Sequence, residues 1–239
     1  AAASGSEDTA ISLSLSSALT DADGSESLGI VISGVPTGAS LSAGTDNGDG
    51  TWSLTSGQLS GLSITPPSND DTNFTLTVTA TSTDGTSTNQ SVGTVDVSVG
   101  AVADTPSLNV AAASGSEDTA ISLSLSSALT DTDGSEGLTV VISGVPTGAT
   151  LSAGTDNGDG TWSLIQSQLS GLSITPPSDD ASDFPLTVTA TASEGGATSQ
   201  SVGTIDVSVA GVADTPSLSV AAASGNEDTA ISLSLSSAL

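Results

Sequence analysis

A repeat of 110 residues is the feature of this sequence that most limits what it can fold into. The segment AAASGSEDTAISLSLSSAL occupies residues 1–19, recurs unchanged at 111–129, and returns at 221–239 with Asn226 in place of Ser116. Between 1–110 and 111–220, 87 positions are identical. A repeat of this length exceeds the roughly 20 to 50 residues of a solenoid turn and matches a small domain with its own core. We therefore expect separate domains in tandem.

The repeat predicts three segments in the chain. Residues 1–103 are a first repeat that lacks its first strand, residues 104–213 are a complete second repeat, and residues 214–239 begin a third. The chain opens on AAASGSEDTA, without Met and without the basic and apolar regions of a signal peptide. Because it also stops inside a repeat, we expect it to be a segment of a longer protein.

The apolar residues alternate with polar ones, which is typical of strands that bury one face. Within one repeat we expect strands at 28–34, 39–42, 51–54, 74–82 and 91–99, preceded by strands like 106–110 and 120–125 of the second repeat. Residues 39–42 and 51–54 are expected to pair as a hairpin with Trp52 in the core, and 62–67 either prolongs the latter strand or adds a short one. The Asp84-Gly85 pair favours a hairpin turn.

Seven antiparallel strands in about 110 residues, with closely spaced turns, are typical of an immunoglobulin-like sandwich. The predicted fold class is therefore all-β, with tandem seven-stranded immunoglobulin-like or cadherin-like β-sandwich domains in an extended array.

The charge of the chain excludes several function classes. It has 27 acidic residues, no Lys, Arg or His, and a formal charge of −27. Such a chain is repelled by nucleic acids and by anionic membranes, so neither is expected as a partner. There is no Cys for disulfide or thiol chemistry and no stretch apolar enough to insert into a membrane. Only four residues are aromatic, and this composition argues against an enzyme pocket.

The strongest local motif is LTDADGSESL at 19–28, which returns as LTDTDGSEGL at 129–138. It places Asp21, Asp23 and Glu26 within six positions, and no basic side chain can neutralise them. The positive charge must therefore come from solution. Oxygen ligands without His or Cys favour Ca²⁺ or Mg²⁺ over zinc, copper or iron, and flexible loops with many carboxylates favour Ca²⁺.

The motif differs from two common calcium signatures. An EF-hand would need its glycine at position six and Glu at position twelve, whereas glycine stands at position four and Ile32 at position twelve. The nonapeptide GGxGxDxUx of toxin-type β-rolls is absent as well.

Strands that alternate in direction would place the acidic loops at the two ends of each domain. The loops with Asp21, Asp23 and Asp84 lie at one end, and Glu7 and Asp104 lie at the other. A junction between consecutive repeats then gathers acids from both. At an effective dielectric of about 20, two like charges ~5 Å apart cost roughly 3 kcal/mol, which a shared divalent cation would offset.

Three motifs in a fixed order carry a resemblance to a known family: EDT at 7–9, DxDG fourteen residues later, and VADTP at 102–106. Together they resemble the cadherin-like and immunoglobulin-like tandem repeats of large bacterial RTX-type surface adhesins, in which calcium is shared between domains. The resemblance implies one ligand set at the junction of repeats 1 and 2, namely Glu7, Asp104, Asp131 and Asp133. It also implies that Glu117 and Asp214 begin the following junction and that Asp21 and Asp23 serve a preceding domain.

Two points of this assignment stay open. VADTP is poorer in acids than the cadherin linker DxNDNxP, so fewer ions per junction are implied. If Glu7 and Asp8 instead lie in the middle of one long bent first strand, Asp104 would pair with Asp21 and Asp23. DxDG can also be a simple turn, since Asp and Gly favour turns without a metal.

The sequence therefore favours a structural function. We expect extender repeats in the stalk of a secreted bacterial cell-surface adhesin, as in a biofilm matrix, with Ca²⁺ at the junctions between neighbouring repeats of the same chain. The alternative is an extracellular fibre, sheath or matrix built from identical chains by packing or strand exchange. A carbohydrate- or ice-binding module has weaker support, from the threonine-rich FTLTVTATST at 74–83 alone.

Overall fold

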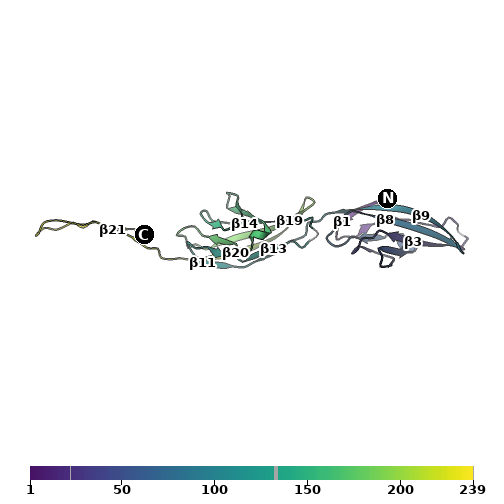
Figure 1. Cartoon of the computed structure of the whole chain (residues 1–239), viewed down its shortest axis with the longest axis horizontal. Coiled ribbons are helices and arrows are strands. Elements are labelled where there is room, and N and C mark those ends of the chain that lie inside the picture. Colours follow the sequence, from purple (N-terminus) through teal and green to yellow (C-terminus); the bar gives the residue numbers. More distant parts are fainter. Residues whose placement is uncertain (22, 132–133, 239) are drawn as a thin grey trace. The chain divides into compact units, whose positions relative to one another are not determined.

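The computed structural model describes residues 1–21, 23–131 and 134–238. Their regular structure is β throughout, apart from two single-turn 3-10 helices (Figure 1). Neither helix in these residues is long and apolar enough to cross a membrane. The predicted all-β class is confirmed.

The two repeats contain the same series of strands, except that the second has two more, β10 and β13. In the first repeat the elements are β1 (Ala2–Ser6), β2 (Ile11–Ser12), β3 (Ser27–Ser33), β4 (Ser40–Leu41), β5 (Thr45–Asp46), β6 (Thr51–Leu54), η1 (Ser56–Leu59), β7 (Ser63–Thr65), β8 (Phe74–Asp84) and β9 (Ser87–Gly100). In the second they are β10 (Ser107–Val110), β11 (Ala113–Ser116), β12 (Ile121–Ser122), β13 (Leu125–Ala128), β14 (Gly137–Ser143), β15 (Thr150–Leu151), β16 (Thr155–Asp156), β17 (Thr161–Leu164), η2 (Gln166–Gln168), β18 (Ser173–Thr175), β19 (Phe184–Glu194) and β20 (Ala197–Ala210). The last two are β21 (Ser217–Val220) and β22 (Leu235–Ala238).

Each repeat is a sandwich of a large and a small sheet. The large sheet of the first repeat has the order β1-β9-β8-β3-β6-β5, and the small one has the order β2-β7-β4. The second repeat has the same two sheets, β11-β20-β19-β14-β17-β16 and β12-β18-β15, together with a separate pair, β10-β13. β1 runs parallel to β9, whereas β9 with β8, β8 with β3 and β3 with β6 pair antiparallel, an immunoglobulin-like and cadherin-like arrangement.

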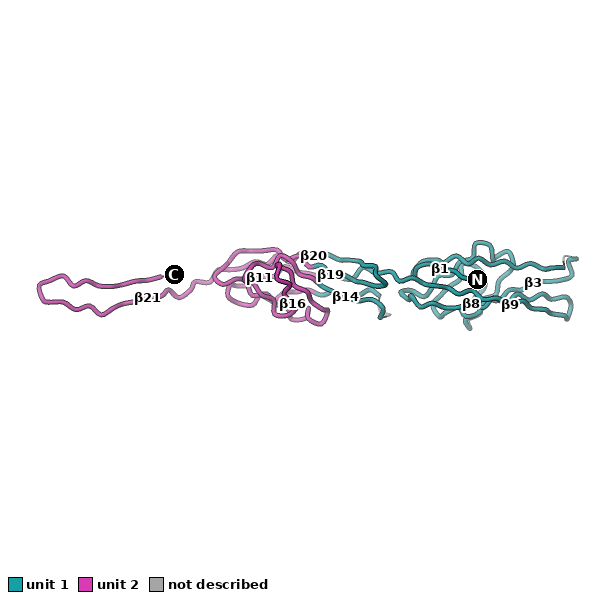
Figure 2. The backbone as a smooth tube through the Cα atoms, turned by 90° about the horizontal axis from the view of Figure 1, so that it is seen from above, with its two compact units in different colours: residues 1–108, 126–140, 189–202 teal, residues 109–125, 141–188, 203–239 magenta. Residues whose placement is uncertain are grey.

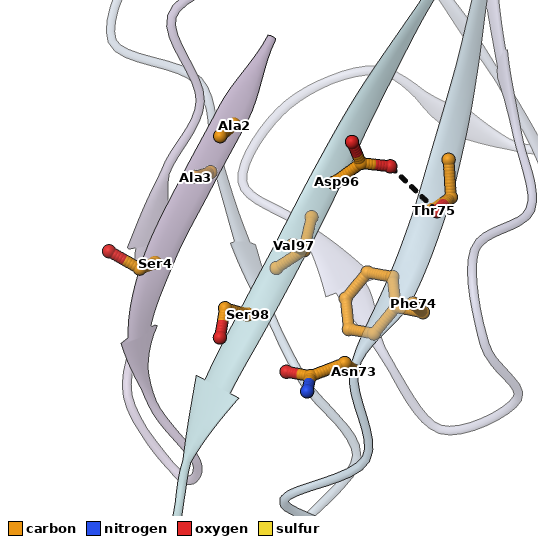
Figure 3. Close-up of a pocket in the computed structure, with 9 residues that line it drawn as sticks. All are labelled: Ala2, Ala3, Ser4, Asn73, Phe74, Thr75, Asp96, Val97 and Ser98. Atoms are coloured by element: carbon orange, nitrogen blue, oxygen red, sulfur yellow. Dashed lines mark hydrogen bonds between the residues drawn. The ribbon is translucent and has the colours of Figure 1, made fainter.

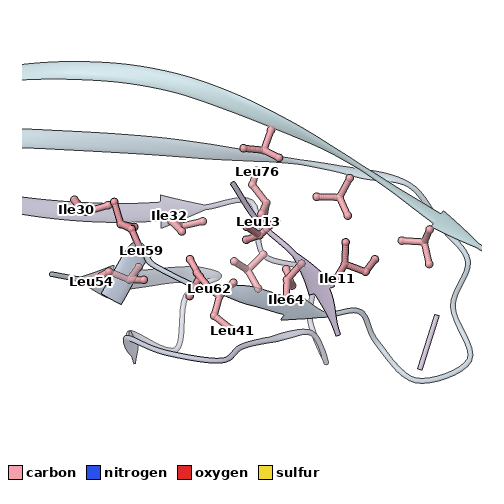
Figure 4. Close-up of a cluster of buried hydrophobic side chains, with 14 residues drawn as sticks. Ile11, Leu13, Ile30, Ile32, Leu41, Leu54, Leu59, Leu62, Ile64 and Leu76 are labelled. Atoms are coloured by element: carbon pink, nitrogen blue, oxygen red, sulfur yellow. The ribbon is translucent and has the colours of Figure 1, made fainter. Parts of the chain in front are cut away.

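The core of the first repeat lies between its two sheets (Figure 4). Successive side chains of a strand point to opposite faces of its sheet. The apolar residues at every second position therefore all face inward, and they form one apolar layer on each sheet. Ile32 and Leu76 come from the large sheet and Ile64 from the small one, and all three are fully buried. Trp52 packs against this layer but is only partly buried, so it is less of a core residue than predicted.

The predicted hairpin between 39–42 and 51–54 is wrong. β4 pairs with β7 in the small sheet, whereas β6 pairs with β3 and β5 in the large one. The chain changes sheets near Gly44, which has φ +105° and lies so close to Leu54 that a Cβ would meet its Cγ at 2.9 Å. A left-handed glycine allows this reversal where other residues would be strained. Residues 63–65 form the short extra strand β7, one of the two outcomes expected.

Two further differences concern the start of each repeat. The strand predicted at 120–125 is divided, because β12 joins the small sheet while β13 pairs with β10. An additional strand, β1 or β11, lies parallel to the last strand of its repeat. Glu7 and Asp8 follow β1 in a turn in which Asp8 has φ 56°. The alternative in which both lie within a long first strand is therefore not observed.

The described chain divides into two compact units (Figure 2). Unit 1 comprises residues 1–108, 126–140 and 189–202, and unit 2 comprises 109–125, 141–188 and 203–239. Unit 1 thus contains nearly all of the first copy of the sequence repeat together with two segments of the second copy, each made of a turn or loop and the adjoining strand residues. The division of the chain into domains at 1–103, 104–213 and 214–239 remains a prediction from the sequence repeat.

Candidate metal centre

Three acidic side chains meet inside unit 1. Glu7, Asp131 and Glu194 each offer a carboxylate oxygen, and these oxygens lie within 4.8 Å of one another. Their exposed fractions are only 1%, 2% and 4%. Glu7 belongs to the first copy of the sequence repeat, and the other two belong to the second. The fold therefore brings carboxylates from distant parts of the sequence into one buried cluster.

Glu7 is held by the end of its strand and by the segment after β9. Its backbone N–H donates to Gly100 O (3.0 Å), which continues the pairing of β1 with β9. Its Oε1 accepts a 2.6 Å hydrogen bond from the backbone N–H of Val102. Its Oε2 is buried and has no hydrogen-bond partner among the described residues. One oxygen fixes the side chain, and the other remains available to a cation.

Glu194 is buried because of its position on β19. Leu186, Val188, Ala190 and Ala192 form the inward row of this strand, and Glu194 is the next residue in phase. The strand ends there, and the tight turn that follows has φ above zero at both Gly195 and Gly196. Neither carboxylate oxygen of Glu194 has a hydrogen-bond partner within the described part of the chain. A buried carboxylate without partners is costly unless a counterion is bound.

A fourth buried carboxylate, Glu136, lies at the edge of the cluster. Its Oε1 accepts a 2.6 Å hydrogen bond from the backbone N–H of Asp104, and its Oε2 is without a partner among the residues described. Glu136 thus contacts the linker at 104 as Glu7 does at 102. Both glutamates keep one buried oxygen that has no hydrogen-bond partner among the described residues.

Burial and mutual repulsion raise the pKa values of two glutamates in and beside the cluster. The pKa of Glu7 is raised to about 7, first by burial and then by the charges of Glu194, Asp131 and Asp8, against the lowering effect of the Val102 hydrogen bond. The pKa of Glu136 is also raised, first by burial and then by the nearby charges, among them Asp131 and Glu194. With no basic residue in the chain, only a proton or a bound cation can neutralise these groups.

The predicted junction residues are brought together in part. Glu7 and Asp131 belong to the cluster, and Asp104 lies beside it through Glu136. Asp133 lies outside the described residues. Sequence reasoning missed Glu194, whose counterpart Asp84 is predicted to lie in a hairpin turn, although the parity of Glu194 with the inward row of β19 could have identified it. Glu136 is the counterpart of Glu26, which was counted among the loop acids but not selected as a ligand.

The other predicted residues lie elsewhere. Asp21 and Asp23 are exposed and bond within their own loop, where Asp21 Oδ1 accepts from Asp23 N (3.1 Å) and Asp23 Oδ1 accepts from Ser25 N (2.8 Å). Glu117 repeats the geometry of Glu7, because its Oε1 accepts from Val212 N (2.6 Å). Asp214 is exposed, and one of its carboxylate oxygens lies within 4.8 Å of a carboxylate oxygen of Asp118 and of one of Asp179.

The donor set of the buried cluster suits a hard cation. All of its donors are carboxylate oxygens, the ligand type that Ca²⁺ takes. Glu7 Oε2 and both carboxylate oxygens of Glu194 have no hydrogen-bond partner among the described residues. Mg²⁺ fits less well, because it usually keeps several waters and needs strict octahedral geometry. Zinc and copper sites normally include His or Cys, which this chain lacks.

A surface hollow on the large sheet of the first repeat offers no comparable chemistry. It is lined by residues of β1, β8 and β9 (Figure 3). Its one carboxylate, Asp96, already accepts a 2.9 Å hydrogen bond from Thr75 Oγ1. The lining holds no second titratable group that could serve as a partner in acid–base catalysis.

No protein-family model and no curated protein matches the chain. Solved structures with a similar arrangement include Drosophila N-cadherin EC1-4 (TM-score 0.38, 14% identity, covering 87% of this chain and 47% of that one). The titin domains z1z2 in complex with telethonin have TM-score 0.34 and 11% identity, with 89% and 93% covered. An endo-fucoidan hydrolase of glycoside hydrolase family 107 has TM-score 0.28 and 18% identity, with 87% of this chain and 34% of the hydrolase covered.

The C-terminal domain of the Streptococcus agalactiae AgI/II polypeptide BspA also matches, with TM-score 0.28, 11% identity, and 76% and 84% covered. Cadherin, titin and BspA domains are not described as enzymes in these structures, whereas the fucoidan hydrolase is. At TM-scores below 0.5, none of these similarities carries an argument about function. Nothing in them favours a self-assembled fibre or sheath, or a carbohydrate- or ice-binding module.

Proposed function

We propose that this chain consists of extender repeats from the stalk of a secreted bacterial cell-surface adhesin, and that Ca²⁺ stiffens the stalk at the joints between consecutive repeats. One observation carries the proposal: buried carboxylates from two sequence copies, Glu7 on one side and Asp131 and Glu194 on the other, share a space that contains no positive charge. Such a cluster is unfavourable without a cation and favourable with one.

The ligands of this site are Glu7, Asp131 and Glu194, with Glu136 as a further donor at its edge. Glu7 and Glu136 also bind the backbone of the linker at 102 and 104. A cation held by these four carboxylates would tie the turn after β1, the linker and the loops at 131–136 and 194–196 to one another. Ca²⁺ accepts six to eight oxygens, so water or backbone carbonyls would complete its coordination.

A joint that needs millimolar Ca²⁺ would tighten outside the cell, where Ca²⁺ is abundant, and stay loose inside. Near-identical repeats fit this role, because a stalk needs many equal joints. A cation that binds only the folded state adds about 2.7 kcal/mol of stability per site when present at a hundred times its dissociation constant.

Small-angle scattering during a Ca²⁺ titration, followed by chelation, tests the proposal. In the wild-type protein we expect the maximum dimension to lengthen and its distribution to sharpen with Ca²⁺, and to revert on chelation. Asp131→Asn should abolish the response. Asp21→Asn is the matched control, because it changes the same motif in the first repeat at an exposed position outside the cluster. Equal rigidity of the wild type in Ca²⁺ and in chelator would refute calcium stiffening.

A further inference from the structure

The linker that follows β9 changes its binding partner along its length. Glu7 Oε1, in the first copy of the repeat, accepts a 2.6 Å hydrogen bond from the backbone N–H of Val102. Glu136 Oε1, in the second copy, accepts a 2.6 Å hydrogen bond from the backbone N–H of Asp104. Ala103, between these two linker residues, makes no hydrogen bond to any described residue. The change from the first copy to the second therefore falls at Ala103.

The end of the linker is tied to the second copy by uncharged groups. Thr130 Oγ1 donates to Thr105 O (2.7 Å), and the hydroxyl groups of Thr105 and Ser199 are hydrogen-bonded at 2.8 Å. Ser201 Oγ donates to Pro106 O (2.6 Å), and Pro106 is buried. None of these groups carries a charge that a cation must neutralise. This part of the linker therefore stays with β20 whether or not a cation is bound.

The turn between β19 and β20 packs on the start of the linker. It consists of Gly195 (φ +54°) and Gly196 (φ +91°), and a type I′ turn requires φ above zero at both positions. A Cβ added at Gly195 would lie only 2.9 Å from Ala101 Cβ, well inside the usual contact distance between carbon atoms. A Cβ added at Gly196 would meet nothing within 4 Å. One of the two glycines is thus in close contact with the linker, and the other faces open space.

This contact lies directly beside the candidate cation site. Glu194 precedes Gly195, and one of its carboxylate oxygens lies within 4.8 Å of one of Glu7. On the other side of the contact, Ala101 precedes Val102, whose N–H donates to Glu7. A shift of the turn against the linker would therefore change the distance between the carboxylates of Glu194 and Glu7.

We propose that Gly195 and Ala101 are positioning residues of the cation site, a proposal that rests on the function proposed above. The joint bends at Ala103, and the packing of Gly195 on Ala101 stops the bend where Glu194 lies beside Glu7. Glycine permits this close approach because it has no Cβ. Neither residue has a flexible side chain that could move aside, so an atom added at the contact displaces the backbone.

The second copy shows that the linker accepts a smaller residue at the contact position. Gly211 is the counterpart of Ala101. A Cβ added at Gly211 would meet Ala181 Cβ and Glu117 Oε1 at 3.6 Å, an ordinary van der Waals distance. Glycine and alanine therefore both fit this position of the linker. Ala101→Gly should create space opposite the turn and leave the conformation of the linker unchanged.

Calorimetric titration with Ca²⁺ tests the positioning. Gly195→Asn keeps the turn, since Asn-Gly is favoured in type I′ turns, but its Cβ meets Ala101, so the dissociation constant should rise on the order of tenfold. Adding Ala101→Gly should restore most of the affinity. Gly196→Asn is the matched control, because it places the same side chain in open space in the same turn. A Gly195→Asn protein that binds Ca²⁺ as tightly as the wild type, is matched by Gly196→Asn, or is not rescued by Ala101→Gly overturns the proposal.

Label distances test the packing independently of calcium binding. The chain has no Cys, so nitroxide labels at Thr198→Cys on β20 and Ser98→Cys on β9, both exposed, report the position of the turn against the first copy. Pulsed electron paramagnetic resonance should show a displaced or broadened distance distribution in Gly195→Asn, and the wild-type distribution once Ala101→Gly is added. A wild type that binds no Ca²⁺ would refute calcium stiffening, and the label distances would then decide this proposal alone. An unchanged distribution in Gly195→Asn overturns it in either case.

Discussion

Glu7 Oε1 accepts a 2.6 Å hydrogen bond from the backbone N–H of Val102, 95 residues further along the chain. Glu117 and Val212 form the same bond at the same length in the second repeat. The bond therefore belongs to the repeat itself and fixes each glutamate against the linker that follows its last strand. What distinguishes Glu7 is its surroundings, because a carboxylate oxygen of Asp131 and one of Glu194 lie within 4.8 Å of one of its own.

Replacing Glu194 should weaken calcium binding. Glu194→Gln keeps the shape of the side chain but removes a charge from the buried cluster, so the dissociation constant for Ca²⁺ should rise on the order of tenfold or more. Isothermal titration calorimetry measures this change directly. Asp84→Asn is the matched control, since Asp84 occupies the same position in the first repeat but is exposed. Equal loss in both variants would contradict the assignment of Glu194 as a ligand.

Glu7→Gln should raise the stability of the protein without Ca²⁺ and lower it with Ca²⁺. In chelator above pH 7 the variant should be more stable than the wild type, by about 1 to 3 kcal/mol, because it removes a buried charge while its Oε1 can still accept from Val102. With saturating Ca²⁺ it should be less stable, because a ligand is lost. Urea unfolding in both buffers measures the two differences.

Glu117→Gln is the control for this reversal. Glu117 makes the same bond to the linker at Val212, but no described acidic cluster includes it. The substitution should change stability in the same direction and by a similar amount with and without Ca²⁺. If Glu7→Gln behaves in this way, Glu7 only binds the linker backbone and is not a calcium ligand.

The metal-free protein should lose stability as the pH rises through neutrality. Burial raises the pKa of Glu7 from 4.5 to about 7. Between these values the folded state keeps a proton that the unfolded state has released, so the free energy of unfolding falls with pH. The total loss between pH 5 and pH 8 should be about 3 kcal/mol for this group. Urea unfolding in chelator measures it, and Glu7→Gln should flatten the profile. A wild-type free energy of unfolding that rises over this range would contradict the raised pKa of Glu7.

Most of the fold follows from period two in the sequence, because β3, β6, β8 and β9 each alternate buried apolar with polar residues. The pairing of the short strands does not follow from it. β4, β5 and β7 have two or three residues each, too few for a pattern, and their partners are decided by the reversal at Gly44.

The candidate site was accessible to sequence reasoning only in part. The loop motif around Asp131 and the acid after β1 carry a local signal. For Glu194 the only local signal is its parity with the inward row of β19, because a carboxylate beside two glycines is otherwise typical of an exposed turn. Its burial depends on how many residues of β19 stay in register before the turn, and that count is set by pairing with β20. Glu136 is buried as well, and it contacts the backbone N–H of Asp104, 32 residues earlier in the chain, which the local sequence does not indicate.

Gly5→Ala should destabilise the first repeat. A Cβ at Gly5 would lie 2.7 Å from Ile11 Cγ1, and Ile11 is a core residue with 1% of its surface exposed. One of the two must move, and overpacking of this kind typically costs about 1 to 3 kcal/mol. Because Gly5 lies in β1, two residues before Glu7, displacement of the strand should also weaken Ca²⁺ binding. Urea unfolding and calorimetric titration of the same protein measure both effects.

Gly93→Ala on β9 is the matched control, because its Cβ would meet nothing within 4 Å. If the two alanine variants unfold at the same urea concentration, the close packing of β1 on Ile11 does not limit stability, and the position of Glu7 must be fixed by its hydrogen bonds to Gly100 and Val102.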